Sequence, residues 1–126
     1  MLTELTYIKT KDKKVPIYAS INVMAEIQKK YGTLDAWMEQ LSGTDDEPDI
    51  TILLESMTMM INEGIEYTNY ADNKNEPSMD QKHVGWLVTE ISVENATSKV
   101  LEAISNGSSG EAPDEEENTE TEEKNL

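Results

Sequence analysis

The chain has 126 residues, a formal net charge of −16 at pH 7 and no cysteine. This length indicates one domain with a modest core plus a tail, and the absence of thiols excludes disulfide frameworks and thiolate metal sites. All ten basic residues are lysine, so the chain lacks arginine forks for phosphate or guanine, and its acidity repels nucleic acids and anionic membranes.

Two short extended runs near the N-terminus predict a β-hairpin. Residues 3–9 alternate polar and apolar side chains, as a half-buried strand does. Residues 13–18 form a second run, in which Pro16 requires a sheet edge or a strand end because it has no backbone N–H. The polar residues 9–14 suit the tip of the hairpin.

Two short helices are expected next. Ser20 or Asn22 can cap a first helix that Gly32 ends, and Thr33 can cap a second helix that ends at Ser42–Gly43. The apolar side chains of these two helices recur at helical spacing: Val23, Met24, Ile27, Tyr31, Leu34, Trp37, Met38 and Leu41.

The most apolar segment predicts a central helix. Asp49 can cap it, and we expect it to close at Asn62–Gly64, with one or two further helical turns over 65–70 and a loop over 71–78. Its apolar side chains form one broad stripe: Ile50, Leu53, Leu54, Met57, Met60 and Ile61.

Two more helices complete the predicted domain. The first starts at Ser78 or Asp80, and the second starts at Ser92, with Glu94 in its first turn, and ends at Asn106–Gly107. Their apolar side chains are Val84, Trp86, Leu87 and Val88 in the first helix and Val93, Ala96, Val100, Leu101 and Ile104 in the second.

The C-terminal segment differs in composition from the rest. Residues 107–110 read Gly-Ser-Ser-Gly, which is typical of a flexible linker, and residues 111–126 hold eight acids against one lysine and few apolar side chains. Such a segment cannot offset its ordering entropy, so we predict disorder. It can serve as a solubilising spacer, mimic a polyanion, or screen a basic surface of a partner.

These elements predict an α+β fold that is predominantly α-helical: a small N-terminal β-hairpin, about five helices and a disordered acidic tail. The predicted boundaries are 1–106 for the mainly helical globular domain with its hairpin and 107–126 for the flexible acidic tail. No apolar run approaches the ~20 residues of a membrane span, and the N-terminus lacks the basic and apolar regions of a signal peptide, so we expect a soluble intracellular protein.

No set of residues suggests catalysis, and we expect neither enzyme activity nor a cofactor, metal or small-molecule substrate. His83 is the only histidine, so no nucleophile–base set is indicated, and a solvated helix residue is its favoured interpretation. Residues 45–49 are acidic but lack the ligand spacing and the glycine of a calcium loop.

Methionine and tryptophan side chains are the candidates for binding a partner protein. Met57, Met59 and Met60 cluster on the central helix, and such adaptable side chains can accept varied partner helices, although filling the core is the favoured alternative. Met59 lies off the main apolar stripe. Trp37 and Trp86 are weighed in the same way, as core residues or as anchors for a partner.

Several segments resemble the tail assembly chaperones of phages and prophages of Gram-positive bacteria. Val-Pro-Ile-Tyr at 15–18 leads into a helix, glycine and short-helix unit at 21–37, and Leu-Leu-Glu-Ser-Met-Thr-Met-Met-Ile-Asn-Glu-Gly-Ile-Glu-Tyr follows at 53–67. The segments 83–88 and 96–104 fit the same layout. The resemblance covers about 100 residues in a pattern of helices and small turns.

The resemblance implies a helical protein of the bacterial host cytoplasm that binds the tape measure protein, keeps it soluble and extended, recruits tail tube protein, and is absent from the mature virion. A homo-oligomer stays an open alternative to a monomer. Many genes of this family also make a longer product by ribosomal frameshifting, and Glu123-Lys124-Asn125 can be encoded by a slippery run.

Two other functions are compatible with this sequence. A structural head–tail or tail-completion protein would remain in the virion. An acidic inhibitor that mimics DNA would need acids arrayed on the folded surface at duplex-like spacing, whereas here the separate tail carries much of the acid density.

Overall fold

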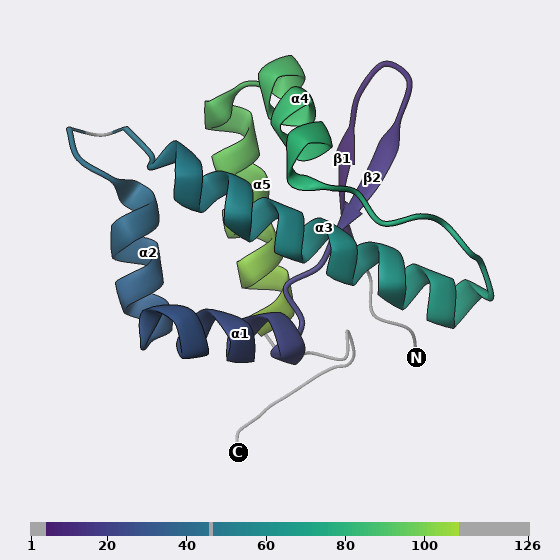
Figure 1. Cartoon of the computed structure of the whole chain (residues 1–126), viewed down its shortest axis with the longest axis horizontal. Helices are drawn as coiled ribbons and strands as arrows, with labels where there is room; N and C mark the ends of the chain where they lie inside the picture. The colour runs from purple at the N-terminus through teal and green to yellow at the C-terminus, as the bar shows by residue number, and fades with distance from the viewer. Residues whose placement is uncertain (1–4, 46, 109–126) are drawn as a thin grey trace, which may run out of the picture.

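An N-terminal hairpin and five helices make up the part of the chain that the computed structural model describes, residues 5–45 and 47–108 (Figure 1). The predicted class, α+β and predominantly helical, is confirmed. The predicted disorder of 111–126 lies outside the described residues. The elements are β1 (Thr6–Lys9), β2 (Lys14–Ile17), α1 (Ile21–Tyr31), α2 (Leu34–Ser42), α3 (Ile50–Asp72), α4 (Gln81–Ile91) and α5 (Val93–Ser108).

The hairpin is antiparallel, with Thr6 opposite Ile17 and Lys9 opposite Lys14. Its turn is closed by a hydrogen bond of 2.9 Å from the backbone N–H of Thr10 to the carbonyl of Lys13. Both strands are edges in a two-stranded sheet, so the missing N–H of proline in β2 is tolerated. The side chains on one face are buried in the core: Ile8, Val15 and Ile17.

Local capping explains where the helices begin. A polar side chain just before or at each helix start accepts a hydrogen bond from a backbone N–H in the first turn, which satisfies a donor that the helix itself cannot. Gly32 and Gly43 end α1 and α2 with positive φ angles, as predicted. The capping residues are Ser20, Thr33, Asp49, Asp80 and Ser92.

The predicted end of the central helix at Asn62–Gly64 is wrong. Helix α3 continues through Gly64 for 23 residues in all, and Asn73, in the left-handed conformation, terminates it. The reason is tertiary: a Cβ atom added to Gly64 would lie 3.0 Å from the Cβ of Pro16 in β2. Gly64 therefore allows the helix and the hairpin to pack closely, and it does not form a turn.

Helix α5 likewise passes through its predicted end at Asn106–Gly107 and reaches Ser108. A Cβ atom added to Gly107 would clash with the carbonyl oxygen of Ala19, so this glycine also permits a close backbone contact. The helix thus takes up the first two residues of the segment that we predicted as linker.

Helix α3 is the centre of the fold. It crosses the molecule in Figure 1 and packs against the hairpin and the other four helices. The backbone N–H of Tyr18, just after β2, donates to the Met60 carbonyl of α3 at 3.0 Å. Its buried side chains lie in one continuous core with residues of every other element: Leu53, Met57, Met60, Ile61 and Ile65.

Two glutamates of α3 bind α1 along one side of the core. The carboxylate of Glu63 accepts hydrogen bonds from the Ser20 hydroxyl and from the Asn22 amide, the latter at 3.2 Å. The carboxylate of Glu55 accepts from the Lys30 ammonium at 2.8 Å and from the Tyr31 hydroxyl at 3.3 Å. The hydrogen bond from Lys30 holds the pKa of Glu55 below its ordinary value.

Two asparagines of α3 hold the loop that leads to α4. The side-chain amide of Asn62 donates to the Met79 carbonyl at 2.8 Å and accepts from the Met79 N–H at 2.7 Å. Asn69 makes the same pair of bonds with the backbone of Glu76, at 3.0 and 2.9 Å. Because the two asparagines are two helical turns apart, they attach the loop along one face of α3.

Candidate protein-binding groove

Three of the five predicted partner-binding side chains lie in the core. Trp37, Met57 and Met60 each have 0% exposed surface, so a partner cannot contact them in this structure. The indole N–H of Trp37 donates a buried hydrogen bond of 2.8 Å to the Ser56 hydroxyl on α3. This bond satisfies the polar atom of Trp37 inside the protein, so Trp37 takes the role of a core residue, which was weighed against that of an anchor.

The other two predicted side chains differ from these three. Met59 is half-buried and packs against the core, which leaves part of its surface for a partner. Trp86 on α4 is 59% exposed. Helix α4 turns Val84, Leu87 and Val88 inward, and Trp86 lies away from that stripe.

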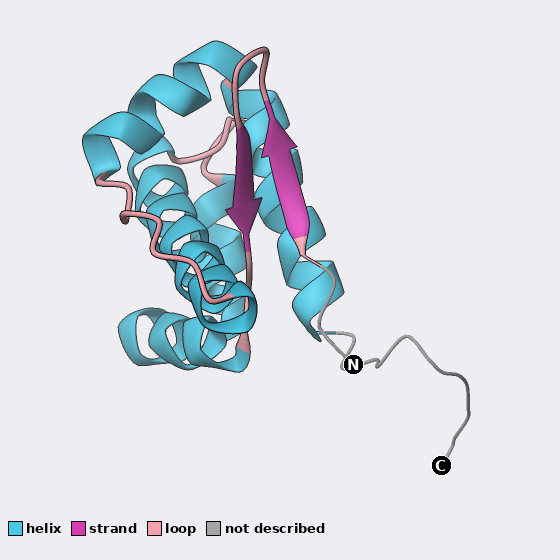
Figure 2. Ribbon diagram, turned by 90° about the vertical axis from the view of Figure 1, so that its right-hand side faces the viewer, coloured by secondary structure: helices cyan, strands magenta, loops and turns pink. Residues whose placement is uncertain are grey.

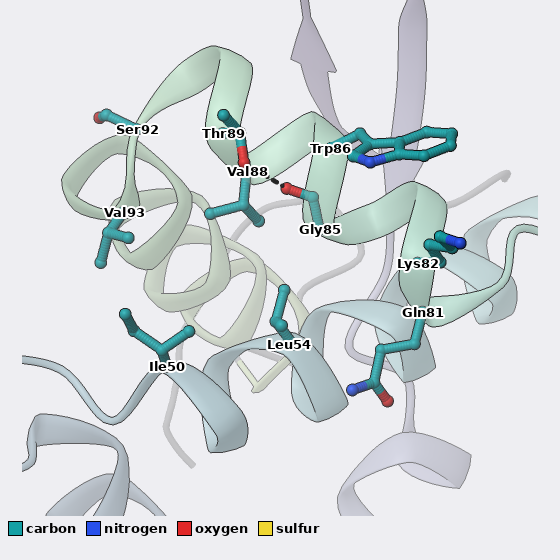
Figure 3. A pocket seen from close by; sticks show the side chains of 10 residues that line it. All are labelled: Ile50, Leu54, Gln81, Lys82, Gly85, Trp86, Val88, Thr89, Ser92 and Val93. Atoms are coloured by element: carbon teal, nitrogen blue, oxygen red, sulfur yellow. Dashed lines mark hydrogen bonds between the residues drawn. The ribbon is translucent and has the colours of Figure 1, made fainter.

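Trp86 lies at the rim of a groove of about 650 Å³ (Figure 3). The groove is formed by the start of α3, one side of α4 and the start of α5. Its apolar lining comes from all three helices: Ile50, Leu54, Trp86, Val88 and Val93. Ile50 is 54% exposed although it is aliphatic, so the groove presents apolar surface to solvent that a partner could cover.

Gly85 and Thr89 determine the wall that α4 contributes to the groove. A Cβ atom added to Gly85 would meet nothing within 4 Å, so the absent side chain leaves the groove open. The Thr89 hydroxyl donates to the Gly85 carbonyl at 2.9 Å (Figure 3). Because this donor is used within the helix, the wall offers mainly apolar contact there.

The polar end of the groove lies at the start of α4. Gln81 and Lys82 line it, and the Lys82 ammonium lies 5.9 Å from the centroid of the Trp86 ring. The His83 ring meets the Trp86 ring edge-on, with centroids 4.9 Å apart. The indole thus contacts a lysine and a histidine of its own helix.

His83 itself is exposed, as predicted, and it contacts the helix cap. Its backbone N–H donates to the Asp80 carboxylate at 2.9 Å, and its Nδ1 lies 2.6 Å from the same oxygen. These two contacts lower the pKa of Asp80. Across residues 5–45 and 47–108, no three side chains of the metal-binding types gather into a candidate metal site. No helix in these ranges is long and apolar enough to cross a membrane.

The sequence interpretation missed the groove residues other than Trp86. Ile50 and Leu54 were assigned to the central stripe and Val93 to the inward face of the last helix. Gly85 is the residue that could have indicated the groove. A glycine inside a helix lowers helix stability, so its position next to Trp86 suggests a reason in packing or binding.

A comparison of the chain with protein-family models, with curated proteins and with solved structures found no significant match. The groove and the sequence resemblance are therefore what supports a functional proposal.

Proposed function

We propose that this protein is a tail assembly chaperone of a long-tailed phage, which binds an amphipathic helical segment of the tape measure protein in the groove between α3, α4 and α5. The observation that carries the proposal is the apolar lining of this groove, with Trp86 and Ile50 largely exposed at its edge. The sequence resemblance supplies the kind of partner.

A helix fits such a groove for physical reasons. Two helices that form the walls can receive the apolar stripe of a third, with interaxial distances of about 8–10 Å. Covering one large apolar side chain contributes about 1.5–3 kcal/mol. Trp86 and Ile50 together can therefore contribute about 3–6 kcal/mol to the binding of a partner helix, and tryptophan is one of the side chain types enriched at binding hot spots.

Charge favours a partner whose apolar stripe is flanked by lysine or arginine. Asp49 caps α3 beside Ile50, and the exposed Glu90 and Glu94 lie in the chain next to groove residues of α4 and α5. Among the described residues that line the groove, Lys82 alone carries a charge. Copies bound along a long partner would also repel one another through the acidic body, which keeps the complex dispersed.

The proposal is tested by co-expressing the protein with the tape measure protein of the same phage. We expect the tape measure protein to become soluble and to co-purify. The Trp86→Ala variant should weaken this capture at least tenfold, because it removes the main exposed apolar side chain. Tyr70→Ala is the matched control, since Tyr70 is an aromatic residue of α3 that is 86% exposed and lies outside the groove lining.

Three results would contradict the proposal. In the first, the tape measure protein stays soluble when it is expressed alone. In the second, the wild-type chain does not co-purify with it. In the third, the Trp86→Ala and wild-type chains capture it equally well. Mass spectrometry of purified virions separates the chaperone from a structural head–tail or tail-completion protein. A chaperone that leaves before completion is absent from the particles, whereas a structural protein is present in a fixed ratio to the tube protein.

A further inference from the structure

The hairpin carries a concentration of positive charge. Lys9, Lys11, Lys13 and Lys14 are all exposed and share the hairpin with one acid, Asp12. Within residues 5–45 and 47–108, the ion pairs are formed by Lys30, His83 and Lys99, so no described carboxylate neutralises a hairpin lysine. The Lys14 ammonium lies 4.4 Å from the centroid of the Tyr7 ring.

A hollow of about 930 Å³ extends this basic surface. It lies between the hairpin and the loop before α4, and it brings Lys74 to the same hollow as Lys13 and Lys14. Two acids also line it, Glu76 and Asp80, but the Asp80 carboxylate is already engaged by His83. The hollow therefore suits a short acidic peptide.

Helix α5, which leads into the acidic end of the same chain, ends at the base of the hairpin. The Asn106 amide in the last turn of α5 donates to the Thr6 hydroxyl at the start of β1, at 2.6 Å. Figure 2 shows the end of α5 beside the base of the hairpin. Strands rise about 3.3 Å per residue, so the lysines at the tip lie about 10–17 Å from Thr6.

The spacing of the acids matches this distance. The last described residue of α5 is Ser108, and the first acid after it is Glu111. An extended chain spans at most about 3.3–3.6 Å per residue, so residues 111–117 can reach from about 10 to 30 Å beyond the end of α5. This segment holds five of the eight acids that follow Gly110 and no lysine.

We propose that residues 111–117 bind the hairpin lysines and the adjoining hollow of their own chain. The short connection raises the local concentration of the acids to the millimolar range, so that modest ion pairing suffices. Bound in this way, the segment covers a basic surface of an acidic protein and prevents it from attracting the acidic faces of other copies. The inference does not depend on the proposed function.

Paramagnetic NMR on the full chain tests this inference, because the chain has no cysteine and Thr119→Cys gives a unique site for a nitroxide. At about 20 mM salt, we expect the amide signals of residues 9–14 to lose more than half their intensity. At about 0.5 M salt they should recover, since the Debye length then falls to a few ångströms. The amides of Lys29 and Lys30, a basic pair on α1, should keep their intensity in both buffers.

Matched charge variants identify the surface. Lys11→Gln combined with Lys13→Gln should abolish the broadening, whereas Lys29→Gln combined with Lys99→Gln, which removes the same charge elsewhere, should leave it unchanged. Broadening that persists in the hairpin variant or in high salt would overturn the proposal. So would an absence of broadening at low salt.

A mixed sample distinguishes the same chain from a second copy. It combines ¹⁵N-labelled protein without a nitroxide and unlabelled protein with one, so any broadening in it arises between molecules. We expect no broadening of residues 9–14 in this sample. Broadening equal to that of the directly labelled protein would assign the surface to the tail of another copy and overturn the proposal.

Discussion

Gly64 in the middle of α3 lies against Pro16 of β2 so closely that a Cβ atom on the glycine would be 3.0 Å from the proline Cβ and 3.1 Å from its carbonyl carbon. One turn earlier in α3, the Met60 carbonyl accepts the Tyr18 N–H that follows β2. The hairpin and the central helix are therefore joined by direct backbone contact, which depends on the missing side chain of Gly64.

The Gly64→Ala variant should be less stable than the wild-type chain. The added methyl group meets a rigid proline ring and backbone, and such overpacking costs about 1–3 kcal/mol. The better helix propensity of alanine returns only about 1 kcal/mol. Chemical denaturation should therefore give a lower free energy of unfolding.

Gly85→Ala is the control for this prediction, because it is the same change inside another helix. Nothing lies within 4 Å of the added methyl group there, so only the propensity gain remains, and the variant should be about 0.5–1 kcal/mol more stable. Equal shifts for the two variants would mean that the contact with Pro16 does not limit the packing of α3.

Ser56→Ala should lower the free energy of unfolding by about 1–3 kcal/mol, because it leaves the buried indole N–H of Trp37 without an acceptor. In a Trp37→Phe background, which has no N–H to satisfy, the loss of unfolding free energy caused by Ser56→Ala should be smaller by about 1 kcal/mol or more. Ser42→Ala is the control: its exposed hydroxyl donates to the Met38 carbonyl of its own helix, and the change should stay within about 0.5 kcal/mol. Additive losses in the double variant would rule out the coupling.

The two asparagines that hold the loop after α3 should differ in importance. Asn62→Ala removes a pair of hydrogen bonds that is partly buried, whereas the pair made by Asn69 is exposed. Hydrogen exchange should show faster exchange of the Met79 amide in Asn62→Ala and of the Glu76 amide in Asn69→Ala. The loss of stability should be larger for Asn62→Ala, at about 1–3 kcal/mol. A larger loss for Asn69→Ala would contradict this order.

Glu55 should make the stability of the folded protein depend on pH below about 6. Its pKa in the folded protein lies below the ordinary 4.5, mainly because Lys30 donates a hydrogen bond to it. A lowered pKa means that the carboxylate contributes stability above about pH 4.5, and that this contribution is lost as the pH falls through the folded-state value. Melting temperatures measured between about pH 6 and pH 3 should therefore fall less steeply for Glu55→Gln than for the wild-type chain.

Glu66→Gln is the control for the acid series. Glu66 is on the same helix, is exposed, and makes no ion pair with a described residue. Its variant should follow the wild-type slope. If Glu55→Gln follows the wild-type slope as well, the ion pair between Glu55 and Lys30 contributes nothing measurable to folding.

The sequence by itself determined the elements and most of their starts. Caps such as Thr33 and Asp49 and stops such as Gly32 act on backbone groups within three or four residues, so the chain shows them before it folds. The alternation in β1 and the helical spacing of the apolar residues likewise depend on local geometry. This is why the hairpin and the five helices could be predicted.

Only the tertiary structure decided what depends on neighbours distant in the sequence. Gly64 has the local properties of a stop, and contact with Pro16 makes it an interior helix residue. Trp37 and Trp86 both belong to apolar helical segments. Trp37 is buried in the core and donates a hydrogen bond to Ser56, whereas Trp86 is largely exposed at the rim of an open groove. Burial depends on which element packs on a given face, and no spacing within a single helix contains that information.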